Sequence, residues 1–136
     1  MADTKRATLT WRRGMVFEGG VAGKAPTVLD AGGPEGPSPM EALLLALAGC
    51  TGADVVSILE KKRVKLVAFS VDVEGARRDE HPKRFTAITL TYRIKASGLS
   101  EEHARQAIEL SLQKYCSVTH SLARDIALRH ELALES

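Results

Sequence analysis

The stretch SPMEALLLALAGCTGADVVSILEKK, residues 38–62, most restricts what this chain can fold into. Ser38 as N-cap, Pro39 at the first helical position and Glu41 three residues after the cap form a capping box, which marks the start of a helix. The first half of this helix is apolar on every side, whereas the second half groups its apolar residues and ends in cations. The sequence therefore predicts a long helix, ending near Lys62, that begins inside the molecule and emerges from it.

Other segments alternate between apolar and polar residues, which is the period of a half-buried β-strand. They are residues 7–12, 67–74, 87–94 and 126–134, and two shorter segments at 15–17 and 27–29 complete the predicted strands. Ser100 caps a second helix that ends near Lys114, and residues 118–124 form one or two further turns with Ser117 as their cap. This order of elements predicts the α+β class with antiparallel sheets.

The chain has 136 residues, of which 44% are hydrophobic and 26% are charged. These values are typical of a soluble globular protein, so we expect a single domain over residues 1–136. A helix that is apolar all round needs cover on several sides, and a chain of this length has little sheet to provide it. We therefore expect an intertwined homodimer, in which a second copy covers the helix.

Charge and motifs disfavour several classes of function. The formal net charge is +2 and no basic stripe is interleaved with aromatic residues, so we expect no nucleic-acid partner. The longest apolar run, residues 42–48, is shorter than the roughly 20 residues of a membrane span, so we expect no membrane partner. The opening residues do not resemble a signal peptide, which predicts a cytoplasmic protein. The four histidines lack ligand spacing and there is no Cys-x-x-Cys, so we expect no metal cofactor.

The two cysteines are the candidate site residues. Cys50 lies within the long helix, and Cys116 follows the second helix, 66 positions later. In a reducing compartment, two cysteines are either inert core thiols or a redox-active pair. A thiolate at Cys116 would be favoured by the helix that begins beside it, whereas Cys50, in mid-helix, would need a neighbouring cation.

The helix face that carries Cys50 changes from apolar to polar. Ala46 and Leu47 share this face on one side of Cys50, and Asp54 and Ser57 share it on the other. Asp54 alone would disfavour a thiolate, so it can help only by holding an arginine against Cys50. Arg13 is the candidate for that arginine, and the alternative is a plain surface arginine of the first strand.

Two segments of the sequence resemble the OsmC/Ohr family, the osmotically inducible and organic hydroperoxide resistance proteins. They are GPSPMEALLLALAGCTGADVVSILEKKR, with Cys50, and SEEHARQAIELSLQKYCSV, with Cys116. The resemblance covers most of the chain. It implies an OsmC-like fold, in which two long central helices of an intertwined homodimer are wrapped by sheets.

The resemblance also implies an activity, that of a thiol peroxidase needing neither metal nor flavin. In this activity Cys50 is the peroxidatic residue, which attacks an organic hydroperoxide and becomes a sulfenic acid. Cys116 is the resolving residue, which forms a disulfide with Cys50, and an external thiol or dithiol then reduces that disulfide. This assignment requires folding to bring the two sulfur atoms close enough to bond.

The chain departs from the family pattern at two positions, which indicates a divergent branch. Met40 stands where the hydroperoxidases have a glutamate that pairs with the activating arginine, and Ser117 stands where they commonly have proline. Glu41 does not replace that glutamate, because it lies on the helix side opposite Cys50. The alternative function is therefore a non-catalytic binder of a small hydrophobic ligand, or a redox sensor, with the same fold.

Overall fold

The computed structural model describes residues 3–135 of the chain. The chain divides into two compact units, the first ending at Leu43 and the second beginning at Leu44. Helix α1, Pro39–Lys61, contains the boundary between them. The single domain expected from the sequence stays a prediction.

The first unit contains a three-stranded antiparallel sheet of β1 (Thr8–Arg13), β2 (Val16–Gly20) and β3 (Thr27–Asp30), in that order. All three strands lie within a few residues of the predicted segments. The expected half-burial of the first strand is wrong for the single chain, because Leu9 and Trp11 are 43% and 62% exposed. Strand alternation gives two faces, but only contacts with other parts decide whether either face is covered.

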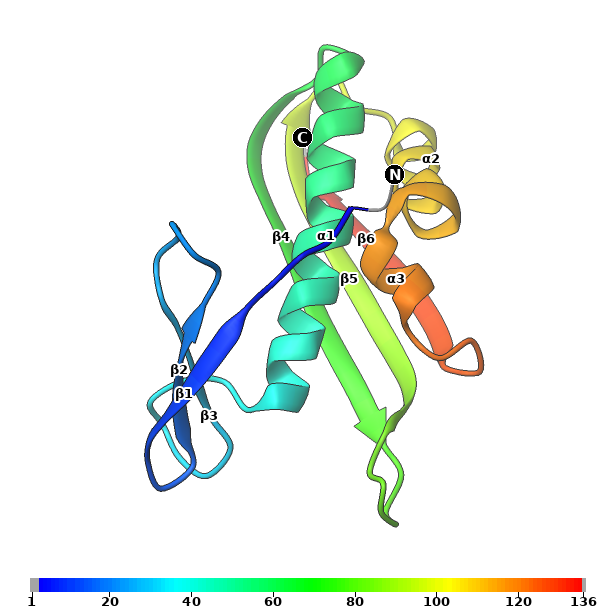
Figure 1. Cartoon of the computed structure of the whole chain (residues 1–136). Coiled ribbons are helices and arrows are strands. Elements are labelled where there is room, and N and C mark those ends of the chain that lie inside the picture. Colours follow the sequence, from blue (N-terminus) through cyan, green and yellow to red (C-terminus); the bar gives the residue numbers. More distant parts are fainter. Residues whose placement is uncertain (1–2, 136) are drawn as a thin grey trace. The chain divides into compact units, whose positions relative to one another are not determined.

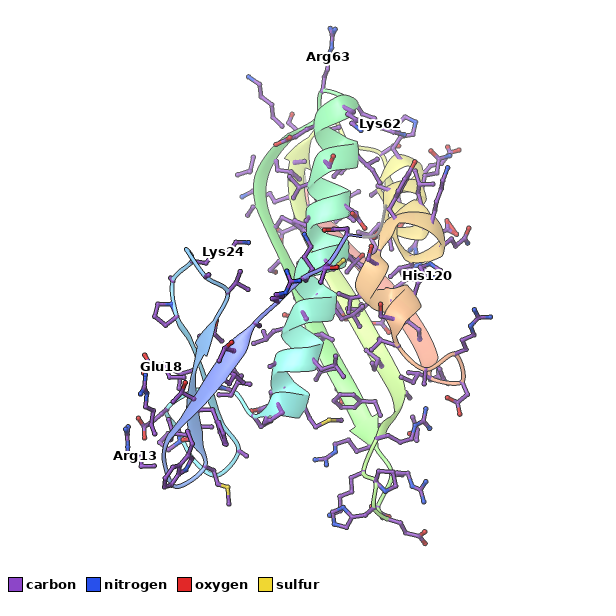
Figure 2. The ribbon with its side chains drawn as sticks, in the orientation of Figure 1. Arg13, Glu18, Lys24, Lys62, Arg63 and His120 are labelled. Carbon is purple, nitrogen blue, oxygen red and sulfur yellow. The ribbon has the colours of Figure 1, made fainter. Side chains whose placement is uncertain are left out.

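Helix α1 begins and ends much as the sequence predicts. The backbone N–H of Ser38 donates to Oε1 of Glu41 at 2.9 Å, and the N–H of Glu41 donates to Oγ of Ser38 at 3.1 Å, so the capping box is confirmed. After Lys61, Arg63 adopts a φ of 61°, and the N–H of Val64 donates to the carbonyl of Leu59. This left-handed residue ends the helix. Figure 2 shows Arg63 pointing away from the ribbon beyond that end.

The burial of α1 is not the one predicted. Its fully buried residues lie in the middle and second half: Leu47, Thr51, Gly52, Val55 and Leu59. In the first half, Leu43 and Leu45 are 36% and 58% exposed in the single chain. The expectation that the helix begins buried and emerges is therefore wrong within one copy, since its more apolar half is the less covered. Length and composition alone would let α1 cross a membrane, a property that core helices of soluble proteins share.

The sheet of the second unit has the order β4 (Lys65–Arg77), β5 (Phe85–Ser97) and β6 (Ala127–Glu135). Strands β4 and β5 pair antiparallel, as predicted, whereas β5 and β6 pair parallel. A parallel pairing requires the chain to cross over between the two strands, and here the crossover is helical. The predicted α+β class is confirmed.

The crossover contains α2 (Glu101–Leu110), a π-helical turn η1 (Ser111–Tyr115) and the short helix α3 (Ser117–Ser121). The side chain of Ser100 accepts from the N–H of His103 and caps α2, as predicted. Helices α1 and α2 lie on the same side of the β4–β5–β6 sheet (Figure 1). Between them and the sheet lies the core, formed by the alternating residues of β5 together with residues of the helices, among them Ile88, Leu90, Tyr92, Ile94, Ala104 and Ile108.

Candidate active site at the two cysteines

The second unit brings Cys50 and Cys116 together. Cys50 lies in the middle of α1, and Cys116 lies between η1 and α3. Both thiols are free, and Cys50 lies close enough to Cys116 to raise its pKa. Cys50 is half-buried, whereas Cys116 is fully buried. The two sulfur atoms that the sequence separates by 66 positions are therefore neighbours, and only one of them is accessible.

A π-helical turn positions Cys116. The N–H of Cys116 donates to the carbonyl of Ser111 at 2.7 Å, which closes the wide turn of η1. Such turns occur often at functional sites, because the extra residue redirects the side chains that follow. Cys116 then serves as the N-cap of α3, where the sequence predicted Ser117. The correction is one residue, and it places the thiol itself at the helix start.

The surroundings of Cys116 act on its thiol in opposite directions. Burial raises the pKa of Cys116, the nearby side chain and backbone of Thr119 lower it, and Cys50 raises it further. The hydroxyl oxygen of Thr119 is buried and has no hydrogen-bond partner among residues 3–135. The Cys116 sulfur is thus the partner available to this hydroxyl, which would donate to it most strongly when the sulfur is a thiolate.

A buried network of hydroxyl groups adjoins the two thiols. Oγ1 of Thr51 lies 2.8 Å from the hydroxyl of Tyr92 and 2.7 Å from Oγ of Ser111. The hydroxyl of Ser111 donates to Oδ2 of Asp54 at 2.9 Å. Thr51, Tyr92 and Ser111 are fully buried. The network thus connects α1, β5 and η1 within the core of the second unit.

The direction of these hydrogen bonds is fixed by proton counting, because each hydroxyl has one proton to donate. Ser111 gives its proton to Asp54, so Thr51 must donate to Ser111 and Tyr92 must donate to Thr51. Burial raises the pKa of Tyr92 to about 12; the hydrogen bond with Thr51 opposes this, and the charges of Cys116 and Asp54 add to it. Tyr92 therefore stays a neutral donor at one end, and Asp54 accepts at the other.

Asp54 and Arg13 have other partners than those the sequence suggested. Asp54 accepts from Ser111, whereas the prediction gave it an arginine. In the first unit Arg13 forms an ion pair with Glu35, whose backbone N–H donates to the Asp30 carboxylate at 3.2 Å. Figure 2 shows the Arg13 side chain at the first unit. The role of Arg13 in favouring a Cys50 thiolate stays a prediction.

Two surface hollows of the second unit lie near the site. One, of about 470 Å³, is lined by seven residues: Thr119, His120, Leu122, Ala123, Arg124, Ile126 and Leu128. Thr119 thus lines this hollow and also acts on Cys116, and His120 marks the position of the hollow on α3 (Figure 2). The other, of about 410 Å³, follows α1 and β4 and is lined by small and apolar residues such as Gly49, Ala53 and Phe69. The first unit has an apolar hollow of its own, of about 320 Å³.

Sequence reasoning identified the two cysteines but missed the polar residues around them. One signal was available, since Tyr92 falls on the apolar face of a predicted strand and a buried tyrosine hydroxyl needs a partner. Thr51 was a candidate for that partner, because it is a polar residue in an otherwise apolar stretch of helix. The partner Ser111 and the donor Thr119 could not be identified, because their contacts depend on the path of the crossover.

The comparisons with known proteins confirm the predicted OsmC-like fold. A family model described as OsmC-like protein matches residues 32–131. Protein YhfA of Escherichia coli strain K12 is 36% identical over 126 residues, which cover 92% of this chain and 94% of YhfA. An OsmC-like protein from Mycoplasma pneumoniae has a TM-score of 0.86 at 19% identity, over 100% of both chains. The organic hydroperoxide resistance protein OhrB of Bacillus subtilis has a TM-score of 0.61 at 18% identity, over 93% of this chain and 97% of OhrB.

Proposed function

Because the chain belongs to the OsmC-like family, we propose that it is a cysteine-based thiol peroxidase that reduces organic hydroperoxides in oxidative stress defence. Cys50 is the peroxidatic residue and Cys116 is the resolving residue. The fold it shares with OhrB, a protein named for organic hydroperoxide resistance, supports this substrate class. The reaction uses the two sulfur atoms and needs no metal or organic cofactor.

In the first step the Cys50 thiolate attacks the outer oxygen of the hydroperoxide. The O–O bond breaks, a Cys50 sulfenic acid forms, and the alkoxide takes up a proton and leaves as an alcohol. The sulfur is oxidised by two electrons and the peroxide is reduced by two. Cys50 suits this role because its half-buried side chain is accessible to a substrate.

In the second step Cys116 attacks the sulfenic sulfur of Cys50. A disulfide forms, and the hydroxyl group leaves with the proton of Cys116 as water. An external thiol or dithiol then reduces the disulfide by exchange and restores both thiols. Cys116 suits this role because it is fully buried, so its neighbour Cys50 reaches it while a bulky peroxide does not.

The single observation that carries the proposal is the pairing of one accessible thiol with one buried thiol close beside it. Inert core cysteines have no need to be adjacent. The pair also requires a reducing environment for turnover, which is consistent with a cytoplasmic protein.

The protein is proposed to act as an intertwined homodimer. The exposed apolar residues of the first half of α1, Leu43 and Leu45, support this assembly, as do Leu9 and Trp11 on β1. Interfaces are marked by contiguous exposed apolar surface, which a second copy would cover.

The test is oxidation of the reduced protein with cumene hydroperoxide, followed by intact mass. The proposal expects a loss of two protons per chain, at a rate that depends on peroxide concentration, and no such loss in Cys50→Ser. A wild-type protein whose mass stays unchanged, or one that oxidises equally well without Cys50, would remove the proposal.

A non-catalytic binder of a small hydrophobic ligand, or a redox sensor, is the second candidate. Met40 in place of the family glutamate favours it, as does the apolar hollow of the first unit, which is lined by Leu9, Met15, Phe17, Leu29, Ala31 and Pro39. This candidate predicts saturable binding of an apolar probe that survives Cys50→Ser, without peroxide turnover.

A further inference from the structure

We propose that Thr51, Ser111 and Asp54 form a clamp that holds Cys50 and Cys116 at disulfide-forming distance. The inference rests on the proposed function for its biological purpose, since it concerns the same thiol pair. Its physical content is independent of peroxide chemistry. It assigns positioning roles to three residues that do not themselves react.

The clamp connects directly to both cysteines. Thr51 follows Cys50 in the chain, so their Cα atoms are separated by one peptide unit of about 3.8 Å. Ser111 accepts the backbone N–H of Cys116 at 2.7 Å. The 2.7 Å hydrogen bond between the Thr51 and Ser111 hydroxyls therefore completes a continuous path of covalent and hydrogen bonds from one cysteine to the other.

Asp54 gives the clamp a second attachment to α1. The Ser111 hydroxyl contacts Thr51 and Asp54, which lie three positions apart on the same helix face. Two contacts from one side chain fix both the distance and the rotation of η1 against α1. The bond to the carboxylate is charge-assisted and stronger than a bond between hydroxyls, so it also fixes the direction of the chain of donors.

Burial makes the clamp rigid. Thr51 and Ser111 have no exposed surface, so water cannot replace a lost partner without entering the core. Removing the Thr51 hydroxyl would leave Tyr92 without an acceptor and Ser111 without its incoming donor. Buried polar groups that lose their partners carry a large penalty, which the structure can relieve by moving η1 away from α1.

The experiment measures the disulfide equilibrium of the pair in buffers of reduced and oxidised dithiothreitol. In this exchange, oxidised dithiothreitol takes two electrons and two protons from Cys50 and Cys116, and no peroxide is involved. Thr51→Val keeps the side-chain shape and removes the hydroxyl. We expect the equilibrium constant for disulfide formation to fall about tenfold, as for the loss of one buried hydrogen bond.

Three further variants make the result specific. Thr51→Ser keeps the hydroxyl and should restore the wild-type equilibrium. Thr86→Val removes the same hydroxyl from β5, where it donates to a backbone carbonyl in an exposed position, and should change nothing. Asp54→Asn keeps the side-chain size but removes the charge, and should lower the constant about threefold, because a neutral acceptor bonds more weakly. Thermal unfolding of each reduced variant checks its fold.

A folded Thr51→Val or Asp54→Asn protein with the wild-type equilibrium overturns the clamp. If Thr51→Val does not fold, Asp54→Asn alone decides the result. The clamp and the proposed function can fail separately. A wild-type protein that forms the disulfide with oxidised dithiothreitol but does not react with cumene hydroperoxide is no peroxidase. The disulfide equilibria of the variants would still show whether the clamp exists.

Discussion

The regions around Cys50 and Cys116 differ in how they treat the same chemical group. Cys50 is half-buried on a helix, with the exposed residues Gly49 and Ala53 beside it. Cys116 is fully buried at a π-helical turn, with Thr119 beside it, and its charge raises the pKa of the buried Tyr92. One region gives access and the other gives a fixed, enclosed position.

The difference in burial therefore matches the two proposed roles, reaction with the substrate at Cys50 and disulfide formation at Cys116. A sulfur that must meet a substrate has to be exposed, whereas a sulfur that must wait for its neighbour is better protected. Mutations should therefore have different consequences in the two regions. The effects on reactivity and stability should be largest at the cysteines themselves and smallest on the exposed side of Cys50.

The largest effect is expected from exchanging the cysteines one at a time. Cys50→Ser should reduce the rate of cumene hydroperoxide consumption by roughly 10³-fold or more, because the nucleophile is lost. Cys116→Ser should keep the first oxidation and accumulate a Cys50 sulfenic acid, which dimedone traps and mass spectrometry detects. Sulfenic acid that accumulates on Cys116 in the Cys50→Ser protein would reverse the two roles.

The next effect concerns stability at high pH in the Cys116 region. The pKa of Tyr92 is raised from 10.0 to about 12 in the folded protein. Between these values the unfolded chain loses the Tyr92 proton while the folded chain keeps it, so the free energy of unfolding falls as pH rises. A shift of this size corresponds to a loss of roughly 2 to 3 kcal/mol by pH 12.

Urea unfolding of the reduced protein at pH 9 to 12 measures this loss. Tyr92→Phe should be less stable at neutral pH but should lose less stability on alkalisation. Tyr115→Phe, which removes the hydroxyl of the half-exposed tyrosine on η1, is the control. An equal alkaline loss in wild type and Tyr92→Phe would contradict the buried, neutral state of Tyr92.

A smaller effect is expected at Thr119. The Thr119 side chain lowers the pKa of Cys116, so Thr119→Val should make the Cys116 thiolate harder to form. We expect disulfide formation after peroxide treatment to slow about tenfold, the effect of losing a hydrogen bond to a charged group. Rapid quenching followed by mass analysis can follow that step. Thr119→Ser keeps the hydroxyl and should behave as wild type; an unaffected Thr119→Val would show that the hydroxyl has no part in resolution.

The smallest effect is expected on the open side. Ser57 shares the helix face of Cys50 but is exposed. Ser57→Ala should change both oxidation and disulfide formation less than about twofold, since exposed substitutions typically alter free energies by at most 0.5 kcal/mol. A larger change in either rate would mean that the Cys50 region is as finely fitted as the Cys116 region, and the contrast between them would fail.

The sequence was sufficient for most of the fold because local patterns determine helices and strands. The capping box at Ser38 and Glu41 predicted the start of α1, and alternation predicted the faces of β5. The parallel pairing of β6 was not predictable, because periodicity does not reveal the direction in which a strand pairs. The exposure of the first half of α1 was also missed, since cover is a property of the assembled molecule.

For the site, residue type identified the reactive groups and geometry was needed for the rest. Cysteine is chemically conspicuous, so Cys50 and Cys116 could be singled out. Serine and threonine are common and have many uses, so nothing in the sequence separated Ser111 and Thr119 from other hydroxyl residues. Only the helical crossover, with its π-helical turn, brings them to the thiols.

The parallel pairing of β5 with β6 has a consequence for the kinetics of folding. Ala87 pairs with Ala127, 40 positions further along, whereas β4 and β5 meet through a short hairpin. Local hairpins form within microseconds, and pairings that close long loops are slower. The segment that carries Cys116 lies inside the slow loop. We therefore expect Cys50 and Cys116 of a refolding chain to become neighbours only when β6 pairs with β5. An oxidant such as air or peroxide would then find the two thiols side by side only after the native topology is complete.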